Sequence, residues 1–381
     1  MHAVFLSVIG ILGASAARAD WGDLRASFAD GARADGIVGA SLFVTRDGAV
    51  LARELHGMAD LETPRPVDED TIYHWGSITK TFTAIAILQL RDRGHLSLDD
   101  PIVRYVPELA AVHDPHGKIE DVTIRHLLSH SAGFRMRTWP WGGEEPWHPF
   151  EPTQWSQLVA MMPYTEILFP PGSRYSYSNP GIVFLGRAIE KLSGDDYEVY
   201  VEKNLFKPLG MTRSYFDRTP YHLLKHRSDN YLLEEGGRRA IGLDFDTGIT
   251  ASNGGLNAPI PDLVKYLAFL VGSPDLSEDA RSVLSRSSLE EMWRPQVPVE
   301  TEPDGTKVSM GLSFFLHEKD GRRLVGHTGS QAGFRAFFYV EPETRHGVIA
   351  AYNTAGESAP RSRYPRLREV FLQAVATDSR K

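Results

Sequence analysis

The chain has 381 residues with no cysteine, a net charge of −8, and 42% hydrophobic and 24% charged residues. This composition is typical of a soluble globular protein, and the length predicts one large domain or two subdomains that share a cleft. The absence of cysteine excludes disulfides, thiolate metal sites and cysteine nucleophiles, and the absence of any basic run argues against nucleic acid and acidic membrane surfaces as partners.

The N-terminal segment has the pattern of an export signal. Residues 3–17 are apolar or small, and Ala17-Arg18-Ala19 before Asp20 fits a small-x-small cleavage site. The apolar run is too short to span a bilayer comfortably. We expect residues 1–19 to be a signal peptide, residues 20–381 to form the mature domain, and the protein to be periplasmic or secreted, without a stable membrane span. A buried N-terminal helix is the alternative.

A β-hairpin is predicted next. Its strands lie over residues 40–46 and 49–55, and Asp47-Gly48 forms the tight turn between them.

Ser77-Ile78-Thr79-Lys80 is the one Ser-x-x-Lys of the sequence, and it opens the apolar segment that runs from Phe82 to Leu90. On a helix, residues three apart share a face, so the Lys80 amine reaches the Ser77 hydroxyl. A serine hydroxyl is a poor nucleophile until a base takes its proton, and a desolvated lysine with a lowered pKa is such a base. The motif predicts Ser77 as nucleophile and Lys80 as base, although by itself it is weak evidence.

The middle of the chain predicts helices separated by loops, over residues 123–130, 179–192 and 262–271. Residues 139–147 are rich in Trp, Pro and Gly and too irregular for a helix or strand. They form either a packed surface loop or an aromatic wall of a substrate pocket.

Tyr177-Ser178-Asn179 is the one Tyr-x-Asn of the sequence. A phenol near a cationic lysine loses its proton more easily than its ordinary pKa implies, so Tyr177 is a candidate to take the Ser77 proton and pass it to a leaving group. Asn179 is a candidate to bond Lys80 or a substrate amide. The alternative is a turn with a buried tyrosine bonded to the backbone.

The C-terminal part predicts an antiparallel sheet and a closing helix. The strands are expected over residues 309–317, 323–326, 333–340 and 347–352, and the helix over residues 365–377. Strands from both ends of the chain indicate an α+β fold, with an antiparallel sheet built from N- and C-terminal strands, flanked by helices, and a helical subdomain inserted at roughly residues 100–250.

His327-Thr328-Gly329-Ser330 lies between two of these strand patterns. Glycines there let a substrate approach the strand edge closely. The Ser330 amide is then placed to complete an oxyanion hole with the Ser77 amide. His-x-Gly alone is very weak evidence, because His74-Trp75-Gly76 is a second copy.

In this order, the three motifs resemble those of the penicillin-recognising serine hydrolases, which include class C β-lactamases, DD-peptidases and related esterases. Tyr177 and Asn179 match the Tyr-x-Asn of the class C branch. The resemblance covers about residues 30–355 and includes residues 123–133, 169–172, 208–212 and 254–256. It implies Ser77 as the acylated nucleophile, Lys80 and Tyr177 as the proton-transfer pair, a cleft between sheet and helical subdomain, and no cofactor.

One motif departs from the family pattern, because His327-Thr328-Gly329 replaces Lys-Thr-Gly. In β-lactamases that lysine helps to hold the substrate carboxylate. A histidine with an ordinary pKa of about 6.5 is mostly neutral at neutral pH, although it can still donate a hydrogen bond. We therefore expect a hydrolase of small ester, amide or peptide substrates that hydrolyses uncharged short-chain esters faster than penicillins.

Three other interpretations remain. A penicillin-binding or sensor protein of the same fold would accept an acyl group without turnover. A zinc metallohydrolase is suggested by His126 and His130, four apart, with His113 and His116 upstream, although no metalloprotease motif accompanies them and we expect no metal site. An α/β-hydrolase is disfavoured because the sequence has no Gly-x-Ser-x-Gly.

Overall fold

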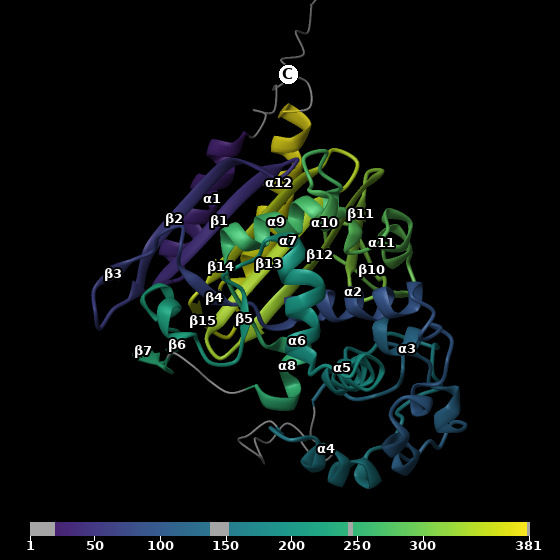
Figure 1. Cartoon of the computed structure of the whole chain (residues 1–381). Coiled ribbons are helices and arrows are strands. Elements are labelled where there is room, and N and C mark those ends of the chain that lie inside the picture. Colours follow the sequence, from purple (N-terminus) through teal and green to yellow (C-terminus); the bar gives the residue numbers. More distant parts are fainter. Residues whose placement is uncertain (1–19, 138–151, 243–246, 379–381) are drawn as a thin grey trace, which may run out of the picture.

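The computed structural model describes residues 20–137, 152–242 and 247–378. Across these residues, nine strands form one antiparallel sheet in the order β3-β2-β1-β14-β13-β12-β11-β10-β9 (Figure 1). The strands are β1 Gly39–Arg46, β2 Ala49–Asp60, β3 Arg65–Pro66, β9 Val297–Thr301, β10 Lys307–Met310, β11 Phe315–Lys319, β12 Arg322–Gln331, β13 Phe334–Glu341 and β14 His346–Tyr352.

The two ends of the chain meet in the middle of this sheet. β1 pairs with β14 in a register that places Phe43 opposite Ile349. The predicted hairpin of β1 and β2 turns at Asp47 and Gly48, which both have positive φ, as a tight turn between twisted strands requires. The predicted sheet of N- and C-terminal strands is therefore confirmed.

Two helices cover one face of the sheet. They are α1, Trp21–Ala34, and α12, Tyr364–Asp378. Leu24 and Phe28 of α1 and Phe371 of α12 belong to one apolar cluster with sheet residues such as Phe337. The closing helix matches the prediction for residues 365–377, whereas no helix was predicted over residues 21–34.

The other face carries the larger core and the remaining helices. α2 Thr79–Asp92, α5 Asn179–Ser193 and α9 Ile260–Val271 are the long ones (Figure 1). The shorter ones are α3 Ile124–Leu128, α4 Trp155–Met161, α6 Tyr197–Val201, α7 Lys207–Leu209, α8 Ala251–Gly254, α10 Glu278–Ser282 and α11 Arg286–Met292.

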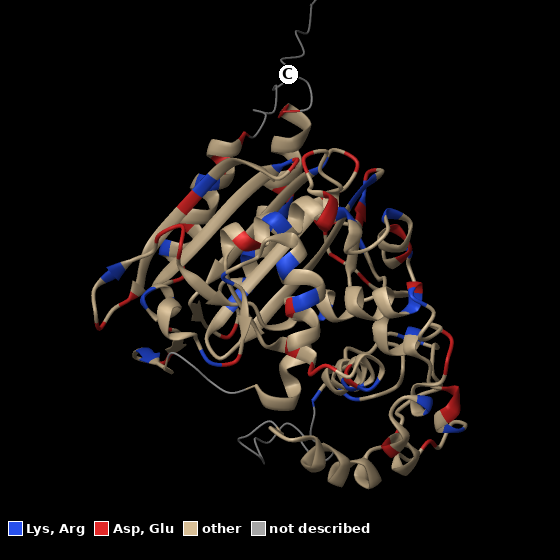
Figure 2. Cartoon of the chain, viewed as in Figure 1, with Lys and Arg blue, Asp and Glu red and all other residues tan. Residues whose placement is uncertain are grey.

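Short strands connect the sheet to the helical part in two small sheets, ordered β15-β6-β7 and β4-β8-β5 within the described residues. Their bounds are β4 Ile72–His74, β5 Tyr215–Phe216, β6 Tyr231–Glu234, β7 Gly237–Ala240, β8 Leu256–Pro259 and β15 Thr354–Ala355. Charged residues of both signs lie mixed on the outer helices, loops and strand ends (Figure 2). No helix of the described ranges combines the length and apolar character that crossing a membrane requires.

α2 is the central helix of the molecule. Every residue from Thr71 to Leu90 is buried except Ser77. A helix that is buried on all sides must sit inside the core, and α2 lies between the sheet and the helical part. Its first turn therefore points into the boundary between these two parts, where the predicted nucleophile stands.

Candidate active site

Ser77 lies in a 3₁₀ turn, Gly76–Ile78, that leads directly into α2. Hydrogen bonds hold the turn at both sides. The Trp75 backbone N–H donates to Leu256 O at 2.8 Å, and the Thr79 side-chain hydroxyl donates to Gly76 O at 2.7 Å. These bonds fix the position of Ser77, the one residue of the segment that solvent reaches.

Strand β12 passes against this turn at very short range. A Cβ on Gly76, whose φ is +51°, would stand 2.8 Å from Ser330 N, and one on Gly329 would stand 2.0 Å from Trp75 O. Both glycines are therefore required by the close approach. It brings the backbone of Ser330 beside the turn that carries Ser77, and the oxyanion hole expected from the N–H groups of these two residues stays a prediction.

Lys80 lies one turn further along α2. Its Nζ donates to Ser77 Oγ at 3.1 Å and to Asn253 O, in α8, at 2.7 Å. The side chain is fully buried, with 0% exposed. The predicted reach of the Lys80 amine to the Ser77 hydroxyl is present. The Asn253 carbonyl was not foreseen, since a backbone acceptor leaves no side-chain pattern in a sequence.

Tyr177 completes the group around Ser77. Its hydroxyl is hydrogen-bonded to the Ser77 side chain, and Lys80 Nζ lies 5.1 Å from the centre of its ring. The expected lowering of its pKa is wrong, because burial raises the pKa of Tyr177 above its ordinary value and outweighs the hydrogen bond from Ser77. In the resting site Tyr177 is therefore a neutral phenol and not a phenolate.

Asn179 is the first residue of α5, directly after the N-cap residue Ser178. Its side-chain Oδ1 is buried and has no hydrogen-bond partner among the described residues. The expected bond between Asn179 and Lys80 is thus not made through this oxygen. A buried acceptor without a partner is costly unless something binds it, which keeps Asn179 a candidate for a substrate N–H.

The sequence had placed His327 between two strands, but in the structure it lies inside strand β12. Its Nδ1 is 2.6 Å from Thr328 O, and because a carbonyl only accepts, Nδ1 carries the proton. Burial, with the nearby charge of Lys80, lowers the pKa of His327 to about 3. His327 is therefore neutral, and its remaining nitrogen, Nε2, is an acceptor without a partner in the described part of the chain. It does not offer the donor that we expected.

Thr328, Gly329 and Ser330 follow on the same strand. Thr328 and Ser330 are half-buried and lie opposite Phe337 and Arg335 of β13. Their side chains point to one face of the sheet and that of His327 to the other, because successive residues of a strand alternate.

His130 is a residue of the site whose place the sequence did not indicate. Its ring stacks on the Tyr177 ring with 4.4 Å between centroids. The zinc interpretation was based on His130 together with His126. In the structure Nδ1 of His130 accepts a hydrogen bond from Ser178 N, and Nδ1 of His126 accepts one from Thr123 N. No group of three or more His, Asp or Glu side chains in the described ranges is placed to hold a metal ion.

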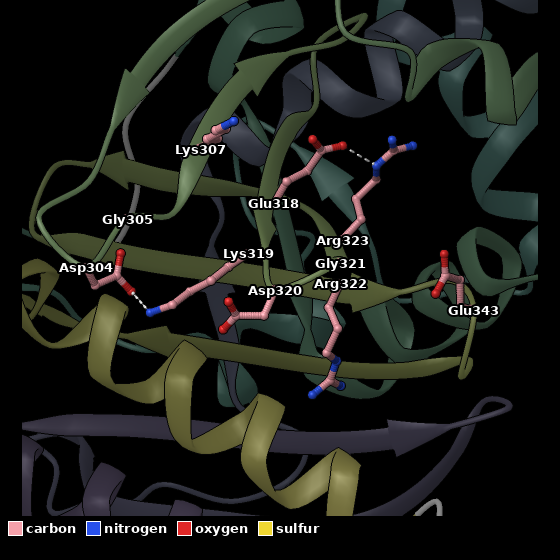
Figure 3. A pocket seen from close by; sticks show the side chains of 10 residues that line it. All are labelled: Asp304, Gly305, Lys307, Glu318, Lys319, Asp320, Gly321, Arg322, Arg323 and Glu343. Atoms are coloured by element: carbon pink, nitrogen blue, oxygen red, sulfur yellow. Dashed lines mark hydrogen bonds and ion pairs between the residues drawn. The ribbon is translucent and has the colours of Figure 1, made fainter.

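A hollow of about 570 Å³ lies at the turn between β9 and β10 and the turn between β11 and β12 (Figure 3). Half of its charged side chains pair within its own wall, since Arg323 pairs with Glu318 and Lys319 pairs with Asp304. It contains none of the predicted site residues. The Trp-rich segment 139–147, predicted as a surface loop or a pocket wall, lies outside the described residues.

Comparison with known proteins gives consistent matches over most of the chain. A family model described as Beta-lactamase matches residues 24–372. Esterase EstB from Burkholderia gladioli is 33% identical over 366 residues, covering 88% of this chain and 90% of the esterase. Protein flp from Staphylococcus aureus (strain COL) is 25% identical over 325 residues, 85% of this chain, which spans only 61% of the length of Protein flp.

Among solved structures, the octameric penicillin-binding protein homologue from Pyrococcus abyssi is similar to this chain with a TM-score of 0.74 and 30% identity. The similarity covers 88% of this chain and 73% of that one.

Proposed function

Because the chain belongs to the Beta-lactamase family, whose model matches residues 24–372, we propose that it is a serine hydrolase that cleaves a small ester or amide through an acyl-enzyme on Ser77. The resemblance inferred from the three motifs, and with it the α+β fold, is confirmed. The observation that carries the proposal is the position of Ser77 Oγ, which contacts both the Lys80 amine and the Tyr177 hydroxyl.

In the proposed reaction the enzyme reacts once the Lys80 ammonium has released its proton to solvent: Ser77 Oγ attacks the substrate carbonyl carbon while the Ser77 proton passes to the Lys80 amine. The carbonyl oxygen becomes negative and is bonded by the N–H groups of Ser77 and Ser330. As the bond to the leaving group breaks, the Tyr177 phenol gives that group its proton and regains one from the Lys80 ammonium. Water then attacks the acyl group by the same proton transfers in reverse order.

The preference for uncharged esters follows from His327. A neutral ring with its N–H committed to Thr328 offers no fixed positive charge to a substrate carboxylate. A charge-assisted hydrogen bond contributes about 1.5–3 kcal/mol, so its absence lowers the affinity for acidic substrates more than for neutral ones. EstB is called an esterase, which supports the same choice.

The test compares p-nitrophenyl butyrate with nitrocefin on the wild-type protein, Ser77→Ala and His327→Lys. We expect a steady ester-hydrolysis rate that Ser77→Ala abolishes, and a higher kcat/KM for the ester than for nitrocefin. His327→Lys should shift the ratio toward nitrocefin by about tenfold, because it restores a charged donor. Efficient opening of nitrocefin without ester hydrolysis would contradict the preference, and stoichiometric labelling without turnover would favour a penicillin-binding or sensor protein.

We also propose that the protein is exported to the periplasm or secreted, on the small-x-small pattern before Asp20. N-terminal sequencing of protein recovered from the periplasmic fraction or the medium should begin at Asp20. A chain that stays in the cytoplasm with residues 1–19 attached would contradict this.

A further inference from the structure

His130 contacts three consecutive residues of the segment that carries Tyr177. Its backbone carbonyl accepts from Ser176 N at 2.7 Å, and its ring Nδ1 accepts from Ser178 N at 3.1 Å. Between these two bonds its ring lies on the Tyr177 ring, with centroids 4.4 Å apart and planes 28° apart. One residue thus holds both neighbours of Tyr177 and the phenol ring itself.

The backbone of His130 is itself held in an unusual conformation. Its φ is +52°, in the left-handed region, and the residue is 1% exposed. Such a conformation is sparsely populated for a non-glycine residue and persists where surrounding contacts determine it, most often at functional sites. Here it occurs just after α3, where the backbone N–H of His130 donates to Leu127 O.

The ring of His130 is neutral and has one defined tautomer. A backbone N–H only donates, so Nδ1, which accepts from Ser178, carries the lone pair and Nε2 carries the proton. Burial and the facing groups Lys80 and His327 hold the pKa of His130 well below its ordinary value. Protonation would turn Nδ1 into a donor that faces the Ser178 N–H, which is also a donor. The hydrogen bond between His130 and Ser178 therefore requires the neutral ring.

We propose that His130 is a positioning residue for the acyl-transfer reaction, which fixes the Tyr177 phenol at hydrogen-bonding distance from Ser77. The inference rests on the proposed function, because Tyr177 matters only if Ser77 is the nucleophile. A displacement of a catalytic group by about 1 Å costs on the order of a hundredfold in rate. A side chain that sets the place of the phenol therefore acts on kcat without touching the substrate.

His130→Asn tests this directly. Asparagine tolerates positive φ and offers an acceptor near the position of Nδ1, so it keeps the backbone and the Ser178 bond while it removes the stacked ring. We expect kcat for p-nitrophenyl butyrate to fall about tenfold to a hundredfold with KM nearly unchanged. In a Tyr177→Phe background the same substitution should cost no further activity, because His130 acts through the phenol.

His126→Asn is the matched control. His126 lies on α3 and also accepts a backbone N–H through Nδ1, from Thr123 at 3.3 Å. Its replacement should leave kcat and KM unchanged, whatever it does to the urea midpoint. If His130→Asn does not fold, as judged by circular dichroism, His130→Gly takes its place, because glycine adopts positive φ without steric cost. It removes both the ring and the Ser178 bond, so we expect a loss of kcat at least as large, again only where Tyr177 is present.

Two outcomes would overturn the positioning role. One is a wild-type kcat in the folded His130 variant, and the other is an equal loss in the Tyr177→Phe background, which would mark a general structural effect. If wild-type turnover is lost in Ser77→Ala while His130 variants are unaffected, the role of His130 falls alone. If the wild-type protein has no turnover that depends on Ser77, the proposed function falls as well.

Discussion

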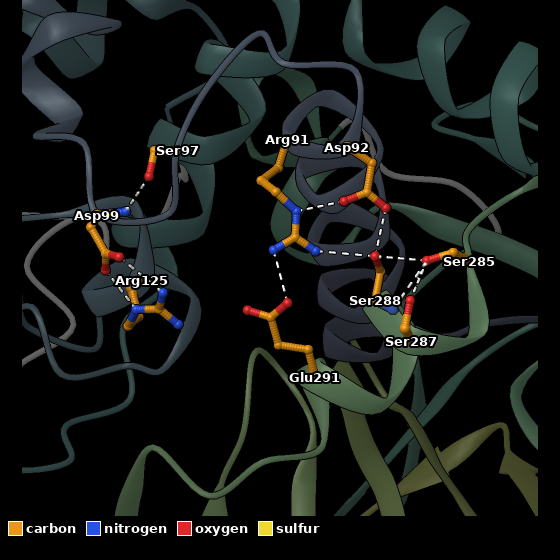
Figure 4. A network of polar contacts seen from close by, with 9 residues as sticks. All are labelled: Arg91, Asp92, Ser97, Asp99, Arg125, Ser285, Ser287, Ser288 and Glu291. Carbon is orange, nitrogen blue, oxygen red and sulfur yellow. Dashed lines mark hydrogen bonds and ion pairs between the residues drawn. The ribbon is translucent and has the colours of Figure 1, made fainter.

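The two ends of helix α2 hold charged side chains in opposite ways. At its C-terminal end Arg91 is partly exposed and pairs with Asp92 and Glu291 (Figure 4). The Ser288 hydroxyl accepts from Arg91 and donates to Asp92. At its N-terminal end Lys80 is fully buried and donates to a hydroxyl and a backbone carbonyl, which are both neutral.

The difference separates charges that support the fold from groups that support chemistry. An exposed ion pair is solvated and screened, so either partner can be replaced at small cost. A buried amine beside a hydroxyl is costly to maintain, and its proton equilibrium is therefore sensitive to its surroundings. Substitutions at the two ends should thus change different quantities, activity at one end and stability at the other.

The largest effect is expected for Lys80→Met. Methionine fills the same buried volume without an amine, so Ser77 loses the group that we propose as its base, and kcat/KM for p-nitrophenyl butyrate should fall on the order of a thousandfold. Labelling of Ser77 by a fluorophosphonate should slow in parallel. A variant that folds and keeps more than half of the wild-type rate would show that Lys80 is not the base.

An intermediate effect is expected on the pH dependence of stability. Burial lowers the pKa of His327 to about 3, whereas an unfolded histidine titrates near pH 6.5. Between these pH values the unfolded chain binds more protons than the folded chain. The contribution of His327 to the free energy of unfolding is therefore fully present above about pH 6.5 and is lost as the pH decreases toward 3. At pH 5 this single residue should account for a loss of about 2 kcal/mol relative to neutral pH.

Urea unfolding at pH 7.5 and 5.0 measures this loss. His327→Gln should reduce the difference between the two pH values by about that amount. His95, exposed just beyond the C-terminal end of α2, supplies the control, and His95→Gln should leave the difference as it is in the wild-type protein. An unchanged difference in His327→Gln would mean that His327 is not held neutral by the fold.

Most of the correct predictions concerned residues that are close together in the chain. Ser77 and Lys80 are three residues apart, and Asp47-Gly48 joins two neighbouring strands, so both features depend only on helix and turn geometry. The helix over residues 21–34 was missed because Asp20 was taken only as a cleavage boundary, whereas in the structure its side chain caps that helix by accepting from Gly22 N and Asp23 N.

What remained hidden depends on tertiary contacts. His130 contacts Tyr177, from which it is separated by 47 positions in the chain, and Ser330 meets Gly76 through the approach of a strand to a turn. The pKa of Tyr177 was predicted in the wrong direction because proximity to Lys80 was visible in the motif pattern, while the desolvation of the phenol was not.

The smallest effect is expected for Arg91→Met, the counterpart of Lys80→Met on the same helix. Arg91 contacts Asp92 at 2.5 Å and Glu291 at 2.9 Å, but its side chain remains 22% exposed, so water and salt already weaken both pairs. We expect a loss of about 0.5–1 kcal/mol in the free energy of unfolding, smaller in high salt, and an unchanged kcat/KM. A loss of activity comparable to that of Lys80→Met would mean that the exposed pair controls the position of Ser77 through the length of α2, and the distinction between the two ends would fail.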